Sequence, residues 1–132
     1  MPFPVELRYI LQTESILQVE FPTLFKNKMQ AENGGEIIAE NEDWQLFPFF
    51  DKSDNKRISR TSNHIILETK EAKEWDNFPS NGIAVGSNGS GDLLVLLPSD
   101  NGAKLKDQIY LWKHETGEIY EVAKSIEELQ NS

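Results

Sequence analysis

Two histidines are the side chains best suited to acid–base chemistry near neutral pH. His64 lies near the expected start of a helix, and His114 lies at the end of an expected strand. Neither has an Asp, a Ser or a second metal ligand at a spacing that would define a catalytic or metal site. We therefore interpret both histidines as structural or exposed residues and not as catalytic ones.

Residues 86–92 (GSNGSGD) have the glycine content of a phosphate-binding loop. They lack the lysine of such a loop, and a strand is expected after them where a phosphate-binding loop is followed by a helix. Glycines in this pattern are typical of a tight connection between two strands. We predict a turn, in which Asp92 accepts hydrogen bonds from the turn's own backbone amides.

The acidic residues do not define a reactive site. Residues 51–55 (DKSDN) resemble the start of a calcium-binding loop but lack its glycine and its closing glutamate. Nothing selects two carboxylates at the separation that glycoside hydrolysis needs, and no serine lies in a nucleophile elbow. With no cysteine in the chain, we predict that this protein is not an enzyme and has no metal or cofactor.

Three tryptophans, Trp44, Trp75 and Trp112, could form a binding site or fill the core. Apolar strand residues surround Trp112, which favours a place in the core. Asp43 precedes Trp44 where a hairpin strand begins, so we expect Trp44 to be partly exposed and able to act as an aromatic anchor for a partner.

Composition indicates an ordinary folded protein with an acidic surface. The 132 residues are 38% hydrophobic, so one domain spanning residues 1–132 can bury a core without disulfides or metals. We expect a soluble, cytoplasmic protein, because the N-terminus has no signal-like segment and the longest apolar run, 93–98, is too short to span a membrane.

The net charge of −9 disfavours binding to nucleic acid, whose phosphates an acidic surface repels. This charge could serve solubility alone. It could also attract a basic protein, and nucleases are basic because they hold nucleic acid.

The N-terminal half predicts helices and one hairpin. Residues 5–19 fit either a helix or a strand, and we favour a helix. Apolar residues at helical spacing predict a helix over 22–32, with Pro22 at its first position and Gly34 and Gly35 at its end. Strands are expected at 36–40 and 44–47, then a charged loop at 51–60 and a helix from Ser62 or Asn63 to about residue 75.

The C-terminal half predicts an antiparallel meander. Its expected strands are 83–86, 93–97, 109–114 and 118–123, and the unbroken apolar run in the second places it centrally in the sheet. Ser125 and Glu128 form a capping box that opens a short last helix. The fold class is therefore α+β, a single domain with a mostly antiparallel central sheet of about six strands and helices packed against it.

Six segments, in order, are similar to the SUKH superfamily, in particular to its branch that resembles the yeast cell-wall synthesis regulators. The resemblance covers residues 16–129. The segments are Phe21-Pro22-x-x-Phe25-Lys26, Asn33-Gly34-Gly35, Trp44-x-Leu46-Phe47-Pro48, Ile83-Ala84-x-Gly86-x-x-Gly89-x-Gly91-Asp92, Tyr110-x-Trp112-x-His114-Glu115 and Val122-Ala123-x-Ser125-Ile126-x-Glu128-Leu129.

The resemblance implies an α+β fold and a role in binding protein. It implies an immunity protein that neutralises a toxin domain of a bacterial polymorphic-toxin or contact-dependent inhibition system by covering it. Its motif residues are expected to be architectural, and they are Pro22, Gly34, Gly35, Gly91, Asp92 and Trp112. The expected partner is a basic toxin domain such as a nuclease, and neither nucleic acid nor a membrane is expected.

From charge and exposure, we predict that the partner-binding residues are Glu40, Glu42, Asp43, Trp44, Asp51 and Asp54. Two alternatives remain open. A scaffold or regulatory module that assembles host proteins would have the same features, and a hydrolase would require two facing carboxylates in a cleft.

Overall fold

The computed structural model describes residues 3–100 and 102–131. Within these residues there are four α-helices, seven strands and one turn of 3-10 helix at Ile126–Glu128. The helices are α1 (Leu7–Leu17), α2 (Thr23–Ala31), α3 (Asn55–Arg60) and α4 (Ile65–Ala72). The strands are β1 (Gly35–Ala39), β2 (Glu42–Leu46), β3 (Ile83–Ser87), β4 (Leu93–Leu96), β5 (Ile109–Trp112), β6 (Ile119–Ala123) and β7 (Gln130–Asn131).

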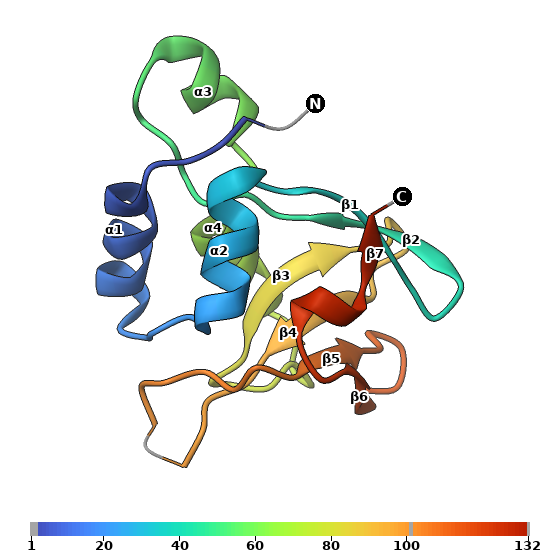
Figure 1. Ribbon diagram of the computed structural model, residues 1–132. Helices are drawn as coiled ribbons and strands as arrows, with labels where there is room; N and C mark the ends of the chain where they lie inside the picture. Colours follow the sequence, from blue (N-terminus) through green and yellow to red (C-terminus); the bar gives the residue numbers. More distant parts are fainter. Residues whose placement is uncertain (1–2, 101, 132) are drawn as a thin grey trace.

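The seven strands form one sheet in the order β6-β5-β4-β3-β2-β1-β7, and each neighbouring pair is antiparallel. The α+β class and the antiparallel sheet are confirmed. The sheet has one strand more than the expected six, because the last two described residues pair with Ile37 and Ile38 of β1. In Figure 1 the sheet is strongly curled, and α1, α2 and α4 lie together on one side of the molecule.

Helices α1, α2 and α4 each bury one face, whereas α3 has no buried residue. Residues 5–19 do form a helix, which turns Tyr9, Ile10 and Thr13 inward. Pro22 precedes α2 as its N-cap, one position before the expected one, so its missing N–H costs the helix nothing. The helix end is followed by Gly34 (φ 107°) and Gly35 (φ 93°), in the left-handed region that glycine tolerates.

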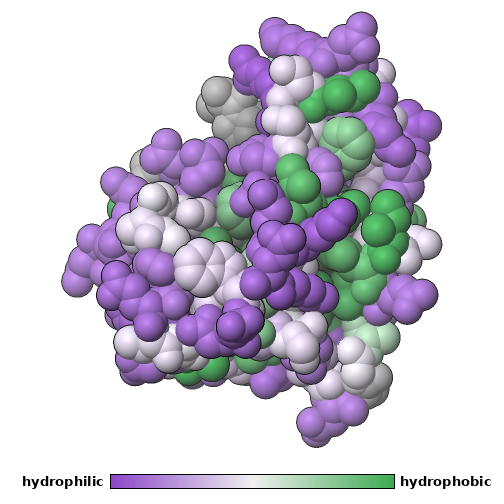
Figure 2. Space-filling model, turned by 180° about the vertical axis from the view of Figure 1, so that it is seen from behind, coloured by the Kyte–Doolittle hydropathy of each residue, from purple (hydrophilic) through white to green (hydrophobic). Residues whose placement is uncertain are grey.

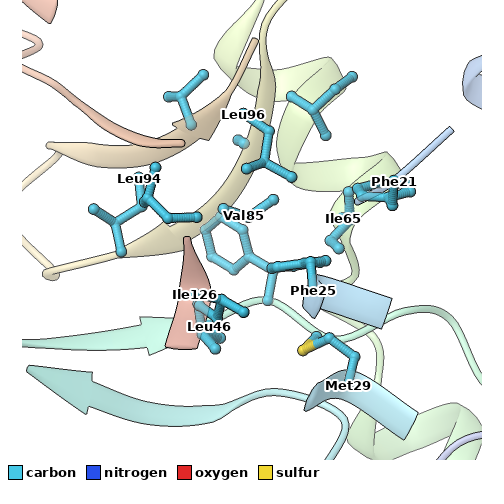
Figure 3. Packing of buried hydrophobic residues seen from close by; sticks show 14 of the residues in the cluster. Phe21, Phe25, Met29, Leu46, Ile65, Val85, Leu94, Leu96 and Ile126 are labelled. Carbon is cyan, nitrogen blue, oxygen red and sulfur yellow. The ribbon is translucent and has the colours of Figure 1, made fainter. Parts of the chain in front are cut away.

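Aromatic side chains fill the core between α2 and the sheet. Phe21, Phe25 and Phe49 pack with ring centroids 5.0–6.0 Å apart, Phe49 edge-on to the other two. Figure 3 shows Phe25 and Met29 of α2 facing a layer of aliphatic side chains from the sheet and from α4. That layer comprises Leu46, Ile65, Val85, Leu94 and Leu96, each fully buried. The apolar run 93–97 forms β4, which lies between β3 and β5 as expected.

Three local predictions are wrong, each for a reason of hydrogen bonding. Residues 51–60 are not a loop throughout, because the Asp54 carboxylate accepts from Arg57 N and starts α3. Neither Ser62 nor Asn63 caps α4, since His64 Nδ1 accepts from Leu67 N. The last helix is a single 3-10 turn without the reciprocal bonds of a capping box, because Ser125 Oγ accepts from Glu127 N and the Glu128 carboxylate accepts from Lys124 N.

Asn33 joins the end of α2 to the segment after β2. Its side chain is buried, and it donates to Phe49 O at 2.9 Å and accepts from Phe49 N at 2.8 Å. The main-chain N–H and C=O of Phe49, a core residue, are therefore both paired with the side-chain amide of Asn33. This pairing fixes the chain between β2 and α3, where no strand partner is available to Phe49.

Asn33→Ala should destabilise the fold by about 2–4 kcal/mol, because it leaves two buried main-chain groups of Phe49 without partners. Urea unfolding followed by circular dichroism measures this as a lower midpoint at unchanged slope. The control is Asn27→Ala on the exposed face of α2, where a change of only roughly 0.5 kcal/mol is expected. Equal midpoints for the two variants would contradict the role of Asn33.

Candidate partner-binding surface

The sheet order brings three turns to one end of the molecule. In an antiparallel meander every second connection lies at the same end of the sheet. The β1–β2, β3–β4 and β5–β6 connections therefore lie together, as Figure 1 shows. We call this surface the turn end and define it as residues 40–43, 87–92 and 113–118.

The β1–β2 connection is a two-residue turn, because Ala39 pairs with Glu42. Glu40 (φ 53°) and Asn41 (φ 62°) both take the left-handed conformation that the tightest hairpin turns require. Glu42 and Asp43 begin β2, whereas the sequence placed them in the turn. All three predicted carboxylates, Glu40, Glu42 and Asp43, are exposed and lie on this hairpin.

Trp44 does not serve as an exposed anchor, and that prediction is wrong. Its side chain is 1% exposed, and its Nε1 donates to Ala39 O at 3.0 Å. Side chains alternate along a strand. Because Asp43 points outward, Trp44 points into the core, where it pairs across the strands with Ile37.

Asp51 and Asp54 support α3 and lie apart from the hairpin in the chain. Asp51 is buried, accepts from Ser53 N at 2.9 Å and lies 3.7 Å from Arg57 Nε, so it is not a residue of an exposed loop. Asp54 is exposed, and its carboxylate also lies 2.9 Å from Arg57 Nη1. The hydrogen bond from Arg57 N is the main cause that lowers the pKa of Asp54.

A groove connects α3 with the turn end along the open face of β1 and β2. It consists of two adjoining hollows of about 740 and 490 Å³, which share Glu36, Gln45 and Asn63. Asp51 and Arg57 line the first hollow, and Asp43 and Asn88 line the second. The groove therefore opens onto the turn end at the hairpin that carries Asp43.

Asp92 joins the β3–β4 turn, the second of the three, to the β5–β6 turn, the third. Its Oδ1 lies 2.7 Å from His114 Nδ1 and accepts from His114 N at 3.2 Å. The prediction that Asp92 binds its own turn is wrong, because Ser87 Oγ and Asn88 Oδ1 already accept from the turn amides of Gly89 and Ser90. The first turn is joined too, since Asn88 Nδ2 donates to Glu42 Oε1 at 3.4 Å.

Gly91 lies directly against the His114 ring. It has φ 109°, and a Cβ atom added to it would lie 2.9 Å from that ring. Burial alone raises the pKa of Asp92, but the hydrogen bonds from the His114 ring and amide outweigh it, and the net pKa is lowered. Asp92 is therefore an ionised acceptor, to which the His114 ring donates through Nδ1–H.

Trp75 is the exposed tryptophan that sequence reasoning missed. Its side chain is 51% exposed and packs edge-on to Trp112 (6.2 Å between ring centroids) and His114 (5.7 Å). Trp112 is fully buried, as predicted, and its Nε1 donates to Asn77 O at 3.1 Å. The sequence does contain an indication that Trp75 is exposed, because the charged residues Glu74 and Asp76 flank it just after a helix.

His64 also has structural contacts besides capping α4. Its ring stacks on Phe50 with centroids 4.5 Å apart, and burial lowers its pKa. Within residues 3–100 and 102–131, no cluster of three or more His, Asp or Glu side chains could hold a metal ion. No helix in that part of the chain has the length and hydrophobicity to cross a membrane.

Hydrophobic surface lies mainly away from the turns. Figure 2 shows the molecule from behind, with a hydrophobic region over the side of α1 and α4 and mostly hydrophilic surface on the side of the turns. Leu7, Leu11 and Leu67 are among the exposed apolar residues of those two helices. The turn end is thus a polar surface with Trp75 beside it.

Comparison with known proteins defines the class to which this fold and surface belong. The model of the SMI1 / KNR4 family (SUKH-1) matches residues 4–132, and the chain belongs to this family. The match begins at residue 4 and not at 16, so α1 is part of the family domain. No curated protein matches the chain. The family is generally non-catalytic, which directs attention to binding.

Asp92→Ala should destabilise the fold by about 1–3 kcal/mol at pH 7, because it removes two hydrogen bonds to a charged acceptor. A lowered pKa in the folded state means that the carboxylate stabilises the fold above its unfolded-state pKa. This contribution is lost as the pH falls through the folded-state pKa. Urea midpoints from pH 7 to pH 3 should therefore converge for the two proteins, with Asp107→Ala as an exposed control. A difference in urea midpoint between wild type and Asp92→Ala that is independent of pH would contradict the role of the ionised Asp92 carboxylate.

Trp75→Phe should remove the component of the intrinsic fluorescence that acrylamide quenches readily, since Trp44 and Trp112 are 1% and 0% exposed. Trp44→Phe should leave that component intact. Stern–Volmer plots of the wild type and both variants provide the measurement. An unchanged accessible component in Trp75→Phe would show that another tryptophan is exposed in solution.

Proposed function

We propose that this protein is an immunity protein that neutralises a toxin domain of a bacterial polymorphic-toxin or contact-dependent inhibition system by covering its active surface. The observation that carries this proposal is the charge of the turn end. Its three segments contain six carboxylates, at residues 40, 42, 43, 92, 115 and 118, against one lysine, Lys113. Family membership supports a binding role but does not identify the partner.

Five of these carboxylates are exposed and one, Asp92, is used within the fold. Glu40 and Asp43 form no ion pair with any residue that the structure describes, so their charge is directed to solvent. A concentrated negative surface raises the encounter rate with a basic partner and suppresses binding to nucleic acid. The partner that fits is a basic toxin domain, for example a nuclease whose own cleft is positive.

The groove beside the hairpin gives the surface a concave part. A protruding loop of a toxin can enter it between the hairpin and α3, while the turns cover the surrounding surface. Occlusion of this kind requires no chemistry from the immunity protein. Occlusion is consistent with the turn end, where the polar side chains bond to turns or face solvent.

Co-expression with the product of the neighbouring reading frame tests the function. Growth rescue by this chain would support immunity. A genomic neighbour without toxicity, together with binding to a host protein complex, would favour the scaffold or regulatory module.

The triple variant Glu40→Lys/Glu42→Lys/Asp43→Lys should slow association with the toxin at least tenfold at low salt, because steering charges act mainly on the on-rate. The wild-type rate should itself fall as salt rises. Stopped-flow fluorescence or surface plasmon resonance provides the rates. Asp51 is left unchanged, because its substitution would disturb α3.

The matched control is Glu71→Lys/Asp100→Lys/Asp107→Lys, which alters net charge equally at exposed positions outside the turn end. It should associate close to the wild-type rate. Equal slowing in both variants would mean that net charge acts and not the hairpin. A wild-type rate in both would move the interface elsewhere.

A further inference from the structure

Trp75 is held in a fixed position beside the third turn. Its main chain lies in the tight turn that follows α4, where Trp75 N donates to Ala72 O at 3.0 Å and Phe78 N donates to Trp75 O at 3.2 Å. Its ring contacts Trp112 and His114 edge-on. A half-exposed indole that is ordered before binding loses little conformational entropy when a partner covers it.

Asn77 joins this turn to the β5–β6 connection. Its Nδ2 donates to His114 O at 3.3 Å, and its main-chain oxygen accepts from Trp112 Nε1. A Cβ atom added to Gly117 would lie 3.0 Å from Asn77 Cβ, so the two turns are in direct contact. Trp75 is therefore continuous with the turn end through His114.

Carboxylates lie next to Trp75 in the chain and beside its neighbour His114. Glu74 and Asp76 are its exposed neighbours in the chain, and Glu115, with a side chain 83% exposed, lies 4.0 Å from His114 Nε2. The lysines in the same two chain segments are Lys73, which follows α4, and Lys113, whose charge helps to lower the pKa of Asp92. The surroundings of the indole are thus negative on balance.

We infer that Trp75 is a binding site for a cationic side chain, an arginine or a lysine, of the protein partner. A cation over an indole face is attracted by the ring quadrupole, and tryptophan is the best aromatic residue for this contact. Arginine also stacks its flat guanidinium on the ring while its donors reach carboxylates such as Glu74 and Asp76. Tryptophan and arginine are enriched among the residues that dominate interface energies.

This inference deepens the proposed function, because it names the chemistry that a basic partner presents. It also replaces Trp44 by Trp75 as the aromatic anchor. The site can be tested without the toxin, so its failure is distinguishable from failure of the proposed function.

The test is a titration with the blocked peptide Gly-Arg-Gly-Arg-Gly at low salt, followed through the indole N–H signals in ¹H–¹⁵N NMR spectra. The chain has three tryptophans, and two of the indoles are internally bonded, Trp44 to Ala39 O and Trp112 to Asn77 O. The Trp75 signal should move and saturate, while that of Trp44 stays in place. The peptide Gly-Glu-Gly-Glu-Gly should cause no saturable shift.

Variants locate the contact. Trp75→Ala should weaken the affinity for the arginine peptide at least tenfold, measured through the amide shifts of residues 74–77 and 113–118. Trp75→Phe should retain part of it. Glu74→Gln/Asp76→Asn/Glu115→Gln should weaken it at least threefold, and the control Glu71→Gln/Asp100→Asn/Asp107→Asn should not.

Three outcomes would overturn the inference. They are shifts confined to residues 40–43 with Trp75 unmoved, equal binding of both peptides, and wild-type affinity in Trp75→Ala. If the arginine peptide binds at Trp75 but the chain rescues no toxin, only the proposed function fails. If rescue holds while the peptide misses Trp75, only this inference fails.

Discussion

The antiparallel order of the sheet is the constraint on which the proposed surface depends. Since each strand reverses direction, the connections after β1, β3 and β5 lie at one end and those after β2, β4 and β6 lie at the other. The connection that contains α3 and α4 leaves and re-enters the sheet at the second end, although its segment at Trp75 and Asn77 reaches the β5–β6 turn. The loop after β4 also lies at the second end. Short turns rich in carboxylates occupy the first. A linear sequence with scattered acidic residues thus becomes a molecule with a concentrated negative end.

Hydrogen bonds between the turns hold this end together. Asn88 joins the second turn to Glu42, Asp92 joins it to His114, and Asn77 joins the third turn to the segment that carries Trp75. Gly91 is required where the His114 ring packs against the backbone. The polar residues of the family motifs therefore serve the architecture of the surface, while their exposed neighbours carry its charge.

The sequence predicted the elements well and the site only in part. Helical spacing in 22–32 and the apolar run 93–97 report burial directly, so α2 and β4 were predictable. Local pattern does not determine which side chain of a half-buried strand faces the core, so Trp44 was assigned to the wrong face. Trp75 has an acidic residue on each side, Glu74 and Asp76, but its exposure depends on where the chain turns after α4. Asp51 and Asp54 look like surface charge in the sequence, and only the position of Arg57 shows that they support α3.

The most direct test of the central claim is amide hydrogen exchange of this chain, free and bound to the product of the neighbouring reading frame. Binding should slow exchange in residues 40–43, 87–92 and 113–118 and in the turn around Trp75. Residues 97–100 and 102–108, at the opposite end of the sheet, should exchange at the same rate in both states. Slowed exchange confined to those residues or to α1, with the turns unchanged, would contradict the claim that the turn end covers the partner.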